Sequence, residues 1–74
     1  MIEVKKLFKA IERDDVDENM QGLISEDIID SIDIMALVAE IEKRFGKALD
    51  AKFITAENFE SFEAISKMLE KAFS

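Results

Sequence analysis

The apolar residues of this 74-residue chain recur at helical spacing in three separate segments, and nowhere do they alternate with a period of two. The clearest segment follows residue 31, where one continuous stripe is formed by Ile34, Leu37, Val38, Ile41 and Phe45. The same spacing recurs near the two ends, at 4–11 and 62–72. The chain is too short for a second core. We therefore predict an all-α fold without a sheet, in a single domain over residues 1–74.

Capping residues set the expected limits of these helices. The first helix should run from about Glu3 to Arg13. The second should begin at Asp30 or Ser31 as N-cap, with Asp33 completing a capping box, and should end at a left-handed Gly46. Further along, Thr55 is expected to cap a brief turn that ends at Phe59, and Ser61 to cap the last helix.

The segment from 14 to 30 breaks the helical periodicity and predicts a long loop. Charges cluster at its start, Gly22 interrupts it, and its apolar residues come in pairs, at 23–24 and 28–29. A loop of this length is unusual in a compact domain unless it has a function. We expect its apolar pairs to pack onto the core.

Composition excludes several classes of function. The net charge of −7 disfavours binding to nucleic acid or to an anionic membrane and suits partners with basic patches. No apolar run could span a bilayer and no signal peptide is recognisable, so we expect a cytoplasmic monomer without stable membrane insertion. The carboxylates form no recognisable acid–base constellation, which predicts no catalytic residue, no metal site and no enzyme activity.

The tetrapeptide Asp30-Ser31-Ile32-Asp33 is the strongest functional candidate. A serine at a helix N-terminus lies among unsatisfied N–H groups and at the positive end of the helix dipole, where a phosphate ester is favoured. The chain has no cysteine and no histidine to activate this hydroxyl as a nucleophile. Ser31 is therefore a candidate attachment point, and its alternative role is an ordinary N-cap.

A second, weaker apolar strip begins beside this serine and consists of Ile32, Met35, Ala36 and Ala39. It points away from the main stripe of the same helix. Either the helix is buried on two sides, or the strip is an exposed edge onto which partner proteins dock.

With these features the chain resembles the acyl carrier protein family. The resemblance rests on Asp30-Ser31-Ile32, on the segments 23–29 and 37–46 around it, and on 57–65, which is similar to the start of the last helix in that family. An Asp-Ser-apolar tripeptide alone would be weak evidence because it is common by chance. Its position after a long loop, in an acidic domain of this length, makes the resemblance specific.

The resemblance implies an up-and-down helical bundle with three long helices and one short helix. It also implies that Ser31 carries a covalent 4′-phosphopantetheine from coenzyme A, transferred by a magnesium-dependent phosphopantetheinyl transferase that recognises Asp30. Acyl-loading and acyl-transferring enzymes would then exchange thioesters with the arm. Docking along the second helix would use Ile32, Met35 and Ala39 as apolar contacts, with Asp33, Glu40 and Glu42 steering the approach.

Two departures from the family pattern bear on the pathway. Residue 36 is a neutral alanine, and Lys43-Arg44 adds positive charge to a helix that is largely acidic in carriers of fatty acid synthesis. The stretch 57–61 is more similar to stand-alone carriers of secondary metabolism, to peptidyl carriers or to D-alanyl carriers. We expect an acyl carrier of a dedicated lipid or secondary-metabolite pathway; the alternatives are a peptidyl or D-alanyl carrier, or a helical interaction module without a prosthetic group.

An EF-hand calcium loop is a further alternative. Asp15, Asp17, Asn19 and Glu26 match four of its ligand positions. Position six of such a loop needs a glycine, and Met20 stands there instead. A tight calcium site is therefore not expected, although weak binding of divalent ions by the acidic loop stays open.

Overall fold

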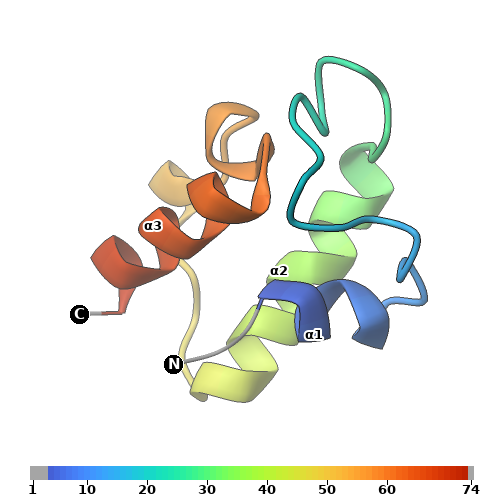
Figure 1. The fold of residues 1–74 in the computed structure, drawn as a ribbon. Coiled ribbons are helices and arrows are strands. Elements are labelled where there is room, and N and C mark those ends of the chain that lie inside the picture. The colour runs from blue at the N-terminus through green and yellow to red at the C-terminus, as the bar shows by residue number, and fades with distance from the viewer. Residues whose placement is uncertain (1–3, 74) are drawn as a thin grey trace.

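The computed structural model describes residues 4–73, and every regular element in that range is helical (Figure 1). Three α-helices span Val4–Ala10 (α1), Ser31–Phe45 (α2) and Phe62–Ala72 (α3). Two single turns of 3₁₀ helix, Ala51–Phe53 (η1) and Glu57–Phe59 (η2), lie between α2 and α3. α1 packs against both of the longer helices, and η2 packs against α3. The prediction of an all-α fold is confirmed.

The expected lengths were partly wrong. Three long helices and one short one were expected, but α1 has only 7 residues and two 3₁₀ turns stand where one short helix was expected. The expected start of the first helix, Glu3, lies outside the described residues. In η2, Ala56 is the preceding residue and makes no side-chain cap, while the Thr55 hydroxyl accepts a hydrogen bond from the Asn58 amide at 3.3 Å.

The first helix ends at Ala10 and not at Arg13 because the backbone turns left-handed at Glu12, where φ is 64°. The Glu12 amide donates to Lys9 O at 3.1 Å, and the Arg13 amide donates to Phe8 O at 2.8 Å. This pair of bonds is the Schellman arrangement that closes many helices, usually at a glycine. With a glutamate at this position, the sequence carries no glycine signal for the stop. After this turn, the Arg13 side chain reaches Ile28 in the loop and Asp33 in α2.

The other two α-helices begin and end where their sequences predict. α2 is capped by Asp30, and its C-cap Gly46 is left-handed at φ 68°, with its amide donating to Glu42 O. Ser61 caps α3 through its hydroxyl, which accepts the Ala64 amide at 3.1 Å. Within residues 4–73 no helix has the length and apolar character needed to cross a membrane.

The core is shared between the helices and the long α1–α2 loop (residues 11–30). Phe8 of α1 stacks on Phe62 of α3, with ring centroids 5.0 Å apart. The loop contributes Val16, Leu23 and Ile29, all of them buried, so the expectation that it packs onto the core is confirmed. The remaining buried apolar side chains come from all three α-helices, from η2 and from the segment before η1: Val4, Leu7, Leu37, Ile41, Leu49, Phe59, Ile65, Met68 and Leu69.

Candidate functional site

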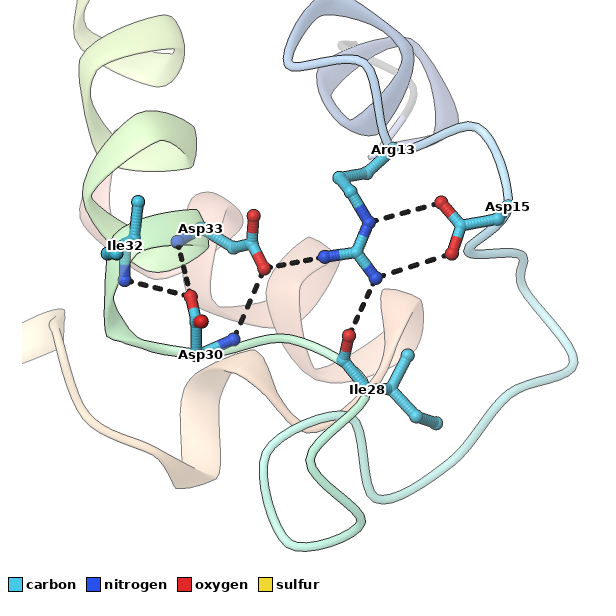
Figure 2. Close-up of polar contacts among 6 residues, drawn as sticks. All are labelled: Arg13, Asp15, Ile28, Asp30, Ile32 and Asp33. Carbon is cyan, nitrogen blue, oxygen red and sulfur yellow. Dashed lines mark hydrogen bonds and ion pairs between the residues drawn. The ribbon is translucent and has the colours of Figure 1, made fainter.

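The candidate site is the junction between the α1–α2 loop and the first turn of α2 (Figure 2). Asp30 has an extended backbone, and one of its carboxylate oxygens accepts the amides of Ile32 at 3.0 Å and Asp33 at 3.1 Å. In return, the Asp33 carboxylate accepts the Asp30 amide at 3.2 Å. This reciprocal capping box holds two amides of the first turn that would otherwise lack partners.

Ser31 is the first residue of α2 and is exposed. Its hydroxyl makes no hydrogen bond with any of the residues that the structure describes. The sequence left open whether Asp30 or Ser31 caps the helix, and the structure assigns the cap to Asp30. The Ser31 hydroxyl is therefore not used by the fold, and it lies at the surface where a second protein could reach it.

Arg13 lies at the start of the same loop, just after α1, and its side chain reaches the site (Figure 2). Its guanidinium donates to the Asp33 carboxylate and to Ile28 O, both at 2.6 Å, and forms a two-point contact with Asp15 at 3.1 and 3.3 Å. The hydrogen bond from Arg13 lowers the pKa of the Asp15 carboxyl, and the same bond raises the pKa of Arg13. The role of Arg13 could not be predicted from the sequence, because its partner Asp33 lies 20 residues away in the chain.

Glu60 holds another part of the same loop. It precedes the cap of α3, and its carboxylate accepts the amides of Ile24 at 2.7 Å and Ser25 at 3.0 Å and the Ser25 hydroxyl at 2.8 Å. Its own carbonyl accepts the Leu23 amide at 2.8 Å. The backbone hydrogen bond from Ser25 is the main reason that the pKa of Glu60 lies below its ordinary value. This contact could not be predicted either, because it joins residues 35 and 36 positions apart.

The second apolar strip of α2 is largely exposed. Ile32 and Met35 have 74% and 73% of their surface accessible, and Ala39 is exposed as well. Only Ala36 is half-buried. On the opposite face of the same helix, Leu37 and Ile41 are fully buried. The helix is therefore buried on one side, and an apolar edge begins at the residue that follows Ser31.

The three acidic residues expected to steer partners all have partners within the chain. Asp33 pairs with Arg13, Glu40 pairs with Arg44 at 2.9 Å, and the Glu42 carboxylate accepts the Leu49 amide at 2.8 Å. Each of the three is half-buried, whereas Lys43 and Arg44 are exposed. The surface of α2 thus presents apolar side chains and positive charge more openly than it presents these carboxylates.

The alternative of a calcium loop finds no support in the geometry. Asp15 is engaged by Arg13, and the Asp17 side chain accepts the Asn19 amide at 2.9 Å. Among residues 4–73, no three acidic side chains lie close enough together to hold a metal ion.

The fold and the site together define a small helical domain with an accessible serine at the head of its central helix. Comparison with protein families matches residues 4–69 to the family described as "Phosphopantetheine attachment site". The match covers nearly the whole chain, and the protein belongs to this family. Neither the comparison with curated proteins nor that with solved structures gave a match.

Membership in this family fixes the cofactor and the general role. Domains of the family are sites of covalent 4′-phosphopantetheine attachment. They are generally non-catalytic carriers that work with a phosphopantetheinyl transferase and with acyl-handling enzymes. The group supplies a thiol, which this cysteine-free chain does not have.

Proposed function

We propose that this protein is an acyl carrier whose phosphopantetheine is attached to the hydroxyl of Ser31. The observation that carries the proposal is that the N-cap of α2 and the exposed serine beside it are two different residues. Asp30 caps the helix, and Ser31 is left exposed with its hydroxyl unused by the described residues. A serine that served only as an N-cap would have its oxygen on the amides of the first turn.

The chemistry of attachment is consistent with this position. A transferase joins the Ser31 oxygen to the phosphorus atom next to the pantetheine of coenzyme A. The pyrophosphate bond of coenzyme A breaks in the same step, and the nucleotide part leaves as adenosine 3′,5′-bisphosphate. We assign the base that takes the hydroxyl proton to the transferase, because this chain has no histidine. Asp30, which directly precedes Ser31 in the chain and is exposed, would be recognised by that enzyme. Tethering then gives the thioester a high effective concentration at each docked partner.

Intact-mass spectrometry tests the assignment directly. The apo protein, incubated with coenzyme A, magnesium and a broad-specificity transferase, should gain the mass of one phosphopantetheine. Ser31→Ala should gain none. Ser61→Ala is the matched control, because Ser61 also follows an acidic residue at the start of a helix, and it should gain the full mass. A mass gain that survives Ser31→Ala would disprove the assignment, and a functional Ser31→Ala protein would favour an unmodified interaction module.

We further propose that the carrier serves a dedicated lipid or secondary-metabolite pathway, with partners docking on Ile32, Met35 and Ala39. The support is the exposure of these side chains and the positive charge at Lys43 and Arg44, which opposes docking to a basic enzyme surface. Asp33, Glu40 and Glu42 would steer the approach of partners by their charge more than by direct contact, because each is half-buried and bonded within the chain. Peptidyl or D-alanyl cargo is the alternative within the same family.

Loading kinetics test the choice of pathway. The holo protein should be a poor substrate for a housekeeping malonyl transferase, and Lys43→Glu/Arg44→Glu should improve it. Wild-type rates equal to those of a housekeeping carrier, unchanged by the charge reversal, would instead assign the protein to fatty acid synthesis.

A further inference from the structure

Arg13 is the one side chain that binds the chain on both sides of Ser31 in Figure 2. One arm of its guanidinium reaches the carboxylate of Asp33, two residues after the serine, and the other reaches the carbonyl of Ile28, three residues before it. Both distances are 2.6 Å. A planar guanidinium can hold two acceptors in fixed directions at once, which a lysine ammonium does less well.

The contact with Asp33 also reaches the residue next to the serine. The same oxygen of Asp33 that accepts Arg13 also accepts the Asp30 amide, so Arg13 fixes the side chain that completes the capping box. Asp15 in turn binds two nitrogens of Arg13 and orients it from the solvent side. A continuous chain of contacts therefore runs from the end of α1, through Arg13 and Asp33, to Asp30.

The segment around Ser31 depends on such a contact because it follows an irregular loop. Asp27, just before it, has a left-handed backbone with φ of 56°. Between Asp27 and α2, the Ile29 amide donates a hydrogen bond to Leu23 O. The other polar contacts of this segment that Figure 2 shows are those of the capping box and of Arg13. Arg13 is only partly accessible, at 27% of its side chain, and its partner Asp33 is less so at 18%, which limits screening by solvent.

We propose that Arg13 is a positioning residue for the modification of Ser31: by tying Ile28 and Asp33 together, it holds the serine in the one backbone conformation that the transferase uses. This inference rests on the proposed function. It predicts that Arg13 acts on the reactive conformation of the docked carrier, and so on kcat, and contributes little to docking.

Three variants test the proposal. Arg13→Ala removes every contact of the guanidinium, Arg13→Lys keeps the charge without the two-acceptor geometry, and Lys67→Ala is the matched control. The control removes one positive charge and one ion pair, that with Glu63 on α3, so its net charge equals that of Arg13→Ala. Circular dichroism and unfolding by urea establish that each variant is folded.

Steady-state modification by a transferase gives the first measurement. We expect Arg13→Ala to lower kcat roughly tenfold or more with KM within about threefold, since small misplacements of a reacting group cost factors of this size. Arg13→Lys should fall between Arg13→Ala and wild type, and Lys67→Ala should leave kcat within about twofold. Unchanged kcat in a folded Arg13→Ala protein would overturn the proposal, as would a loss confined to KM, which would make Arg13 a docking contact. Should Arg13→Ala not fold, Arg13→Lys decides by the same criterion.

Amide hydrogen exchange of the unmodified proteins gives a measurement that needs no transferase. The Asp30 amide, which bonds to Asp33, should exchange faster in Arg13→Ala and at the wild-type rate in Lys67→Ala. The Gly46 amide, bonded to Glu42 O, is the internal reference. Equal protection of Asp30 in all variants would overturn the positioning role. Absence of any mass gain in the wild-type protein would instead refute the proposed function, and exchange would still decide the role of Arg13.

Discussion

The starts of α2 and α3 carry the same pattern of residues and have different structures. Asp30-Ser31-Ile32-Asp33 and Glu60-Ser61-Phe62-Glu63 both read acid, serine, apolar, acid. In the first, Asp30 caps the helix, Ser31 is exposed and Ile32 faces solvent. In the second, Ser61 is the cap and is buried, and Phe62 lies in the core. The same pattern of residue types thus places one serine in a buried capping position and the other at the surface, where a partner protein can reach it.

The length of the acidic side chain explains much of the difference. An aspartate carboxylate reaches the amides two and three residues ahead, which is the usual geometry of an N-cap. The longer glutamate side chain at position 60 reaches back to the loop instead, where it binds the Ile24 and Ser25 amides, and the cap passes to Ser61. Moving the cap by one residue decides which serine keeps a free hydroxyl. An acid–serine pair at a helix start therefore indicates an attachment site only together with the identity of its cap.

The largest effect expected from this comparison is on the third residue of each pattern. Phe62→Ala should lower the free energy of unfolding by about 3–5 kcal/mol, because it removes a buried ring that stacks on Phe8. Ile32→Ala should change it by no more than about 0.5 kcal/mol, because that side chain is exposed. Unfolding by urea, followed by circular dichroism, measures both. Similar losses in the two variants would mean that the apolar edge of α2 is part of the core.

Part of the fold and of the site could be predicted from the sequence, although the choice between Asp30 and Ser31 as cap could not. Helical spacing and caps gave α2, α3, Gly46 and Ser61 correctly, because those signals are local. The early end of α1 was missed because a left-handed glutamate carries no signal of its own. The contacts of Arg13 and Glu60 were missed because they join residues 15 to 36 positions apart, which only the folded loop brings together.

A smaller effect separates the two serines. Asp30→Ala and Ser61→Ala each remove a cap and should cost about 0.5–2 kcal/mol of stability. Ser31→Ala removes no cap and places a better helix former at an exposed helical position, so the change should be near zero or slightly stabilising. Midpoints of urea unfolding distinguish the three variants. A loss for Ser31→Ala as large as that for Ser61→Ala would show that Ser31 shares the capping role.

The smallest expected effect concerns the acid dependence of the Glu60 contact. The pKa of Glu60 is lowered in the folded protein by the hydrogen bonds from Ser25 and Ile24. Its contribution to stability is therefore present above the pKa of the unfolded chain, and it is lost as the pH falls through the lower pKa of the folded state. Glu60→Gln keeps the shape of the side chain but has no charge to lose, so it should be less stable near neutral pH and should lose less stability on acidification.

Urea unfolding at about pH 6 and about pH 3 measures that loss, because these values bracket the ordinary pKa of glutamate. Glu63→Gln controls for the removal of one carboxylate at the start of α3, where Glu63 pairs with Lys67 at the surface. Asp15, whose pKa is lowered by its hydrogen bond from Arg13, contributes to acid sensitivity in all three proteins alike. The difference between wild type and Glu60→Gln therefore isolates the contact between Glu60 and the loop.

If the two proteins lost equal stability between these pH values, the carboxylate of Glu60 would not hold the loop through its charge. The acid before Ser61 would then be no different in role from any exposed glutamate, and the contrast with Asp30 would rest on the cap alone.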